Sequence, residues 1–304
     1  MNTMQRRVLC DWGSSRLRAF LDVDGTIVDR REGPGIASPD APPIVVLRQA
    51  LDSWRSSGDF DQILLCGMVG SRNGLVEVPY VATPIGSNAW AERSVSHRVD
   101  ELDLTIAPGV CGHSSSGAPD VMRGEEAQIF GAFLCHSPLA QGAHVVLLPG
   151  THSKWVDVRD GSILSFQTFI TGELFALLRD RSSLMRTGES KGESETGFAE
   201  GLERAGRAGL AQSLFETRSA QLLLARTQDW ARGFLSGVLI GDEVATMLRT
   251  RTIRGAVTVI GDPKLSALYR RALAVRSVET TELDGDLCVI AGLRLLATRR
   301  ERVN

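Results

Sequence analysis

The sequence lacks the features that mark several large classes of protein. It contains no run of about 20 apolar residues, so no segment is expected to span a bilayer. The formal net charge is only −2 and the arginines are dispersed, which gives no electrostatic reason to expect nucleic acid or an anionic membrane as a partner. With no signal peptide in view, we expect a cytoplasmic protein, monomeric or homodimeric, that acts on a small molecule.

Common cofactor motifs are missing as well. The five cysteines include no Cys-x-x-Cys pair, so we expect free thiols, buried where they fall in apolar runs. Cys111-Gly112-His113 has no further ligand at metal-binding spacing, which does not favour a metal site. Neither G-x-x-x-x-G-K-[ST] nor a G-x-G-x-x-G after a strand is present. A P-loop NTPase and a dinucleotide-binding fold are therefore both disfavoured.

What the sequence does contain is a repeated glycine turn. Asp11-Trp12-Gly13-Ser14-Ser15-Arg16 follows an apolar strand, and so does Pro149-Gly150-Thr151-His152-Ser153-Lys154. Each leads into another strand that ends in an Asp-Gly turn, 12 positions after Gly13 and 11 after Gly150. Glycine lets the backbone approach a ligand closely, and free N–H groups and hydroxyls can then face phosphate oxygens. The repeat predicts an enzyme that uses ATP.

The pattern of apolar residues predicts the same order of elements, β-β-β-α-β-α, in each half. The first half has strands at 7–11, 17–23, 26–31 and 62–66, a helix at 44–54, and a second helix that starts in the segment 121–126 and runs to about 135. The second has strands from 143, at 155–158, 163–169 and 257–260, and helices from 171, at 234–247, 265–274 and 287–297. Thr171 is expected to cap its helix. Residues 108–119 and 187–196 are expected to form loose loops.

This order predicts an α/β fold of two related domains, 1–138 and 139–304, with a cleft between them that holds both phosphate loops. Packing of the last helix against the first domain is compatible with this prediction. Gly237 and Gly241 lie one turn apart in their helix, which indicates close packing or close approach to a ligand.

Phosphate-binding candidates come from both loops: Gly13, Ser14, Ser15, Arg16, Gly150, Thr151, His152 and Lys154. Asp11 ends the first strand, where its carboxylate could hold Mg²⁺ directly or through water. Ordinary roles stay open for these residues, since Asp and Ser are common in turns and a lone Lys in a loop is usually on the surface.

Two further segments are candidates for the substrate site. The apolar strand at 62–66 ends in a glycine-rich loop whose members are Met68, Val69, Gly70, Ser71 and Arg72, and open α/β sheets place ligands at such strand ends. Arg123-Gly124-Glu125-Glu126 begins a helix. One Glu could act as general base on a substrate hydroxyl, and Arg123 could pair with an anionic substrate. The alternative is a solvated first turn in which the acids suit the helix dipole.

These motifs resemble those of the actin-like ATPase superfamily, whose domains have an RNase H-like fold. More narrowly, they resemble the 2-dehydro-3-deoxygalactonokinase family. The resemblance also rests on Thr171-Gly172-Glu173-Leu174, Phe234-Leu235-Ser236-Gly237 and Ala291-Gly292, so it covers nearly the whole chain. It implies ATP and Mg²⁺ as cofactors and phosphorylation of 2-dehydro-3-deoxy-D-galactonate at the 6-hydroxyl in galactonate catabolism.

The resemblance also implies roles for single residues. Asp11 matches the acid of the first phosphate loop, Gly150 and Thr151 the second loop, and Gly172 a further nucleotide contact. Gly261 matches the position where the backbone approaches the nucleoside. Leu148 stands where the superfamily usually has an acid, which leaves a second metal-linked acid unassigned. The base is Glu125 or Glu126, with the pattern slightly favouring Glu125.

Two other functions fit parts of this pattern. One is a kinase of another sugar or sugar acid, such as 2-keto-3-deoxygluconate, because the substrate's configuration at C4 cannot be read from the sequence. The other is a non-catalytic, nucleotide-dependent binding protein. The chain has no additional peptide-binding domain or filament-forming insertions, which disfavours the second alternative.

Overall fold

The structure is a computed structural model that describes residues 5–38, 41–58, 60–114, 116–185 and 192–301. Contacts within the chain divide it into two units. Unit 1 comprises Met1–Ala143, Val156–Phe166 and Leu283–Asn304, and unit 2 comprises His144–Trp155 and Gln167–Glu282. The predicted domains 1–138 and 139–304, and the cleft between them, stay predictions.

Unit 1 is built on a six-stranded sheet in the order β3-β2-β1-β4-β8-β7. β1 is antiparallel to β2 and parallel to β4, and β4 is parallel to β8. The strands are β1 (Arg6–Trp12), β2 (Arg16–Val23), β3 (Thr26–Pro34), β4 (Gln62–Gly67), β7 (Val95–Val99) and β8 (Leu102–Ile106). The predicted three-strand meander and the buried strand after it are confirmed.

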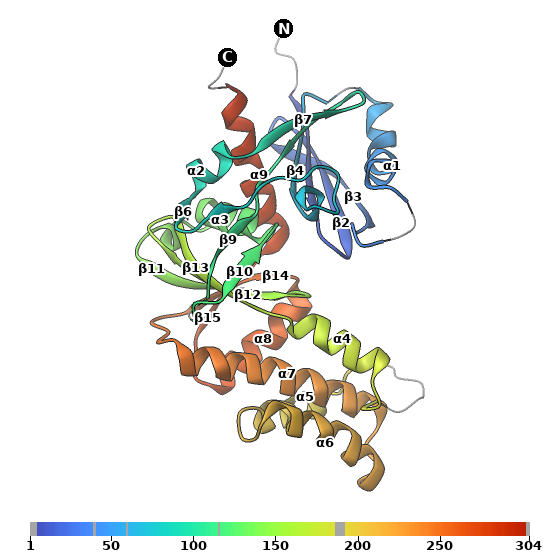
Figure 1. The fold of residues 1–304 in the computed structure, drawn as a ribbon, viewed down its shortest axis with the longest axis vertical. Helices are drawn as coiled ribbons and strands as arrows, with labels where there is room; N and C mark the ends of the chain where they lie inside the picture. The colour runs from blue at the N-terminus through green and yellow to red at the C-terminus, as the bar shows by residue number, and fades with distance from the viewer. Residues whose placement is uncertain (1–4, 39–40, 59, 115, 186–191, 302–304) are drawn as a thin grey trace. The chain divides into compact units, whose positions relative to one another are not determined.

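Helices from both ends of the sequence complete unit 1. The helix α1 (Pro43–Arg55) buries Leu47 and Leu51 in the core formed with β1 and β4. The helices α3 (Glu125–Cys135) and α9 (Gly285–Glu301) pack together, and α9 also contacts β1 and β4. Figure 1 shows α9, drawn in red, beside the blue N-terminal sheet. The expectation that the last helix packs on the N-terminal part agrees with these contacts.

The stretch expected to be a loose loop at 108–119 is instead partly a sheet. The strands β9 (Val110–His113) and β10 (Pro119–Met122) pair antiparallel, and β9 pairs with β5 (Val81–Ala82). The many Pro, Gly and Ser residues of this stretch predict a loop, whereas the two short strands form by backbone pairing with each other and with β5. Unit 1 also contains β6 (Ile85–Gly86), α2 (Ser87–Glu92) and the 3-10 turns η1 (Met68–Gly70) and η2 (Ser137–Ala140).

The second half repeats the strand order of the first. In its sheet the order β13-β12-β11-β14 corresponds to β3-β2-β1-β4, and β11 is parallel to β14 as β1 is to β4. The strands are β11 (Ala143–Leu148), β12 (Ser153–Arg159), β13 (Ser162–Phe169), β14 (Val257–Gly261) and β15 (Thr280–Asp284). The repeat inferred from the two glycine turns therefore exists in the fold.

The described residues of unit 2 form five helices, which are α4 (Thr171–Arg181), α5 (Glu195–Arg204), α6 (Leu210–Leu223), α7 (Gln228–Thr250) and α8 (Pro263–Val275). The predicted loop at 187–196 lies partly outside the described residues, and its last two residues begin α5. The close packing inferred from Gly237 is confirmed. A Cβ on Gly237 would lie 2.3 Å from the carbonyl oxygen of Phe198, and one on Gly201 would lie 2.4 Å from that of Phe234, so α5 and α7 meet backbone to backbone.

Candidate functional site

Asp11 lies near the end of β1 and is 7% exposed. Arg18 occupies the opposite position on β2 and forms an ion pair with its carboxylate. The other terminal nitrogen of Arg18, Nη1, donates a hydrogen bond to Oδ1 of Asp286 at 2.6 Å. Asp286 lies at the start of α9. Burial raises the pKa of Asp11, and the charge of Arg18 opposes that rise. The carboxylate of Asp11 is thus held in place by a cation that the sequence analysis did not select.

The first glycine turn is anchored to the segment after β3. Ile36 and Ala37 donate their backbone N–H groups to the carbonyls of Gly13 and Ser14, at 3.1 and 3.0 Å. Ser14, Ser15 and Arg16 are exposed, while Gly13 is half-buried. The turn therefore has a fixed backbone and presents two hydroxyls and a cation to its surroundings.

Two glycines bring the start of α3 against Asp11. Gly124 has φ +112° and Gly67 has φ +91°, conformations that favour glycine. A Cβ on Gly124 would lie 3.2 Å from the Cα of Gly67 and 3.7 Å from Oδ1 of Asp11. The predicted helix start and the predicted metal-binding acid are therefore neighbours in unit 1.

Glu125 and Glu126 have different environments in the first turn of α3. Glu126 is fully buried, and both of its carboxylate oxygens accept the backbone N–H of Gly124, at 2.9 and 2.8 Å. Burial, and secondarily the charge of Glu125, raises the pKa of Glu126 to about 8. Glu125 is half-buried, accepts the N–H of Arg123 at 3.0 Å, and its charge contributes to the raised pKa of Asp11.

Arg123 is buried at the junction of α3 and the small sheet. Its guanidinium lies over the ring of Tyr80, 4.2 Å from the centroid, and Nη2 donates to the carbonyl of Val78 at 2.7 Å. Among the described residues, neither Nε nor Nη1 has a hydrogen-bond partner. A Cβ on Gly70 would lie 2.8 Å from Nη1, so Arg123 faces the predicted substrate loop.

The remaining residues of that loop vary in exposure. Val69 and Gly70 are buried, and Met68 and Ser71 are half-buried. The side chain of Arg72 is 85% exposed, and its nearest acid is Glu77 at 3.7 Å. Of Arg72 and Arg123, only Arg123 is fixed by its surroundings.

The second glycine turn in unit 2 is fastened to the start of α4. Glu173 donates its N–H to the carbonyl of Thr151 at 2.9 Å, and its carboxylate lies 2.5 Å from His152 Nε2. A Cβ on Gly172 would lie 2.4 Å from the carbonyl oxygen of Gly150. Lys154 is buried and donates to the carbonyl of His152 at 3.1 Å, so the alternative of a surface lysine is wrong.

A buried carboxylate on α7 lies behind this turn. Glu243 is 3% exposed and accepts Ser153 Oγ at 2.8 Å and Trp155 Nε1 at 2.7 Å on one oxygen. Its other oxygen accepts Thr171 Oγ1 and, at 2.7 Å, the hydroxyl of Tyr269. The expectation that Thr171 caps α4 is wrong, because Ile170 is the N-cap residue and the Thr171 hydroxyl is used by Glu243.

A small cavity of about 90 Å³ opens beside the second turn. Apolar side chains predominate in its wall, with polar groups from Glu193, Ser236 and Tyr269. Gly150 and Gly172 also line it, and Gly261 lies close to the turn, since a Cβ there would be 3.5 Å from the carbonyl oxygen of Pro149. Gly150, Gly172 and Gly261 thus lie together in unit 2.

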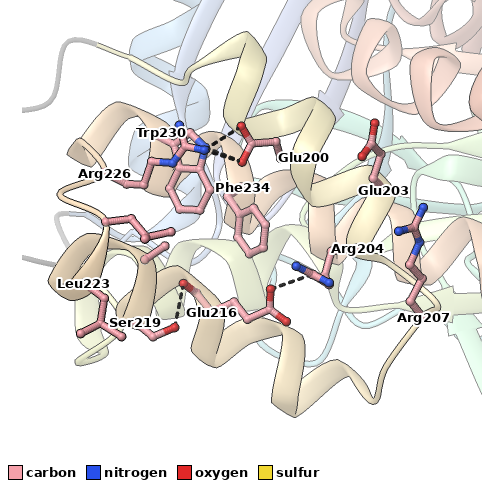
Figure 2. A pocket seen from close by; sticks show the side chains of 12 residues that line it. Glu200, Glu203, Arg204, Arg207, Glu216, Ser219, Leu223, Arg226, Trp230 and Phe234 are labelled. Atoms are coloured by element: carbon pink, nitrogen blue, oxygen red, sulfur yellow. Dashed lines mark hydrogen bonds and ion pairs between the residues drawn. The ribbon is translucent and has the colours of Figure 1, made fainter.

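A larger cavity, of about 440 Å³, lies among α5, α6 and α7 (Figure 2). Glu200 accepts from Arg226 at 3.1 Å and from the indole of Trp230 at 3.2 Å, and Arg204 pairs with Glu216 at 2.7 Å. These charges neutralise one another within the wall. Phe234, from the motif Phe234-Leu235-Ser236-Gly237, lines this cavity, but none of the phosphate, metal or substrate candidates predicted from the sequence does.

The residues present fit Mg²⁺ and ATP. In the described parts of the chain, no three His, Cys, Asp or Glu side chains are grouped as a metal site. Mg²⁺, however, is usually bound through one or two carboxylates together with waters and substrate phosphates, and Asp11 Oδ1 is the oxygen not taken by Arg18. For ATP, the glycine turns offer backbone close to a phosphate chain. The cavity of about 90 Å³ beside the second turn is smaller than the pockets that usually enclose a ligand of nucleoside size. Across the described ranges, no helix is both long and apolar enough to cross a membrane.

Solved structures of low sequence identity share this fold. The activator of 2-hydroxyisocaproyl-CoA dehydratase from Clostridium difficile superposes with a TM-score of 0.54 at 11% identity, covering 98% of this chain and 97% of that one. Gluconate kinase from Lactobacillus acidophilus gives 0.51 at 9% identity, covering 99% and 90%. The predicted α/β fold of the actin-like ATPases and sugar kinases is confirmed.

Closer relatives show the family. The 2-dehydro-3-deoxygalactonokinase of Escherichia coli K12 is 33% identical over 295 residues, which is 96% of this chain and 97% of that enzyme. A crystal structure described as that of a 2-dehydro-3-deoxygalactonokinase protein from Sinorhizobium meliloti has a TM-score of 0.85 and 32% identity, covering 97% and 99%. Residues 11–296 match the 2-keto-3-deoxy-galactonokinase family itself. The chain therefore belongs to this family of kinases, whose members transfer a phosphate to an alcohol group.

Proposed function

We propose that the enzyme transfers a phosphate from ATP to the 6-hydroxyl of 2-dehydro-3-deoxy-D-galactonate. ATP-dependent phosphorylation of this sugar acid, a step in galactonate catabolism, is the reaction of the family that the chain matches over residues 11–296. We infer that it works in the cytoplasm on this small molecule, with Mg²⁺, and as a monomer or homodimer. The observation that carries the assignment of residues is the group formed in unit 1 by Asp11, Glu125 and Arg123.

Glu125 is our choice for the general base. A base must reach the substrate hydroxyl, and Glu125 is only half-buried, whereas Glu126 is fully buried and both its oxygens are on the N–H of Gly124. In this assignment a carboxylate oxygen of Glu125 accepts the proton of the substrate 6-hydroxyl while the hydroxyl oxygen attacks the γ-phosphorus of ATP. The bond from that phosphorus to the bridging oxygen breaks, and ADP leaves. Glu126 holds the backbone at Gly124 and so fixes the direction of the first turn of α3.

Asp11 would hold Mg²⁺ through Oδ1, which also accepts the thiol of Cys66 at 3.8 Å, while Arg18 fixes the other oxygen. When bound, the ion would neutralise charge that develops on the transferred phosphoryl group. Arg18 keeps the Asp11 carboxylate oriented. The guanidinium of Arg18 is itself held by its hydrogen bond to Asp286, a residue of α9. Asp11 is thus a preorganised ligand whose position does not depend on the nucleotide.

Arg123 would bind the substrate carboxylate. A guanidinium matches a carboxylate in a two-point geometry, and Nε and Nη1 are the nitrogens of Arg123 that have no partner among the described residues. Stacking on Tyr80 and the bond to Val78 fix the plane of the group. A neutral sugar would leave this buried cation without an anion, so the residue favours sugar acids.

In unit 2 the second turn, with Gly150, Thr151 and His152, would bind ATP phosphates through backbone N–H groups and the Thr151 hydroxyl. Lys154 would add positive charge behind the turn. The nucleoside would lie beside the turn, where Gly150, Gly172 and Gly261 come together. In unit 1, Gly13, Ser14, Ser15 and Arg16 would contribute the other phosphate contacts.

A coupled ATP-consumption assay tests the function directly. 2-Dehydro-3-deoxygalactonate, its gluconate epimer and a neutral hexose are compared as acceptors. We expect kcat/KM to be highest for the galactonate, by at least about tenfold, and activity with the hexose to be near background. A preference for the gluconate epimer would assign a different sugar acid, and ATP hydrolysis that no acceptor stimulates would contradict kinase activity.

A further inference from the structure

Glu243 connects three elements of unit 2 through one buried carboxylate. Two donors, Ser153 and Trp155, come from the start of β12. Thr171 comes from the first residue of α4, and Tyr269 comes from α8. Each carboxylate oxygen accepts two of the four hydrogen bonds, so all of the about four acceptor sites of the carboxylate are occupied.

The residues bound to Glu243 lie on both sides of the second glycine turn. Ser153 directly follows His152 in the chain, and Thr171 directly precedes Gly172, which touches the turn at Gly150. Beyond Gly172, the N–H of Glu173 holds the carbonyl of Thr151 at 2.9 Å. Glu243 therefore joins the exit of the turn to the helix against which the turn packs.

Glu243 acts on the small cavity only through other residues. Thr171 and Tyr269 line the cavity, as does Gly150, while Glu243 is buried behind them. A carboxylate placed this way has no route to a ligand, but it sets the positions of groups that have one. Donors that are already in place when charge arrives need no reorganisation, which is how fixed hydrogen-bonding sites gain strength.

We propose that Glu243 is a positioning residue that holds the second glycine turn in the conformation that binds the phosphates of ATP. The inference rests on the proposed function, because it takes the turn to be the phosphate site. It adds Glu243, Ser153, Trp155 and Tyr269 to the residues on which nucleotide binding depends. None of these residues is expected to touch the sugar acid.

The test compares Glu243→Gln with Asp242→Asn, a neighbour on the same helix that is only half-buried. Binding of ADP is measured by calorimetry, and KM is measured for ATP and for the sugar acid. A glutamine presents an N–H₂ group to two of the four donors, so we expect ADP affinity to fall and KM for ATP to rise by about tenfold or more. The KM for the sugar acid should stay within about twofold, and Asp242→Asn should match wild type in all three.

Two further variants keep the test decisive if Glu243→Gln does not fold. Ser153→Ala and Tyr269→Phe each remove one donor with little change of shape, and each should weaken ADP binding by about threefold or more. ADP affinity equal to wild type in the folded variants would overturn the inference, as would an equal rise in both KM values. If wild-type enzyme itself does not bind ADP, the proposed nucleotide site fails instead.

Discussion

Arg18 forms its ion pair with Asp11 from the directly opposing position on the neighbouring strand, and its second nitrogen binds Asp286 at 2.6 Å. Asp286 also pairs with Arg30 at 2.5 Å. The buried carboxylate of Asp11 is thus one end of a chain of alternating charges that joins β1, β2, β3 and α9. These ion pairs fix the orientation of the Asp11 carboxylate within unit 1.

Replacing Asp11 by Asn removes the negative charge of the side chain while keeping its shape and position, so it tests whether the charge is needed. The amide can keep a contact with Arg18 but cannot supply a negative charge to Mg²⁺, so we expect kcat to fall at least about tenfold. Thermal unfolding followed by circular dichroism should show a folded protein. Asp52→Asn, on the exposed face of α1, serves as the control and should leave kcat unchanged. Near-normal turnover in Asp11→Asn would remove Asp11 from the site.

Glu125→Gln should abolish most of the chemistry while leaving binding intact. The amide cannot accept the proton of the 6-hydroxyl, and general-base catalysis typically contributes about 10²–10⁴-fold to the rate. We expect a kcat loss of that order with little change in the KM for ATP or in the KM for the sugar acid, each measured with the other substrate at saturation. Glu126→Gln should lose less, since the amide oxygen still accepts the N–H of Gly124. A larger loss for Glu126→Gln than for Glu125→Gln would reverse the assignment.

Glu126 should make stability depend on pH. Burial raises its pKa from 4.5 to about 8, so between those values the folded protein holds a proton that the unfolded chain releases. The free energy of unfolding contributed by this group therefore falls as the pH rises through that range. Urea unfolding at about pH 5 and about pH 8 should show a smaller fall for Glu126→Gln than for wild type. Equal falls would show that Glu126 does not titrate as its burial implies.

Arg123→Lys should weaken binding of the sugar acid selectively. Lysine keeps the charge but loses the planar two-point geometry and the stacking on Tyr80, so KM for the sugar acid should rise by about tenfold or more. The KM for ATP should not change. Arg72→Lys is the matched control, because the Arg72 side chain is 85% exposed and should have little effect. The opposite ranking of the two variants would move the carboxylate contact to Arg72.

Local sequence patterns were sufficient to predict the parts of the fold that are set by neighbouring residues. The meander around Gly13 follows from its apolar strands and from the Asp24-Gly25 turn that joins its second strand to its third. The same register predicts that Arg18 faces Asp11, since Trp12 must pair with Leu17, so the partner of Asp11 could have been found before the structure was known. Glu243 also left a signal, because it falls on the same helical face as Ile240, Val244 and Met247.

Long-range partners could not be found in this way. Nothing near Asp286 indicates that it meets Arg18, 268 residues earlier, and nothing near Thr171 shows that a carboxylate 72 residues later takes its hydroxyl from the helix cap. The strands at 110–113 and 119–122 were missed for the same reason, because their pairing depends on each other and on β5 more than on their own propensity.

The contact between α5 and α7 has a practical meaning for anyone who redesigns this protein. Gly201 and Gly237 each face a carbonyl oxygen of the other helix, so a side chain added at either position would force the two helices to move apart. Replacing a helical glycine by alanine usually raises the free energy of unfolding, but at these two positions it would lower it. Exposed Leu223 on α6 is a safer place to begin engineering.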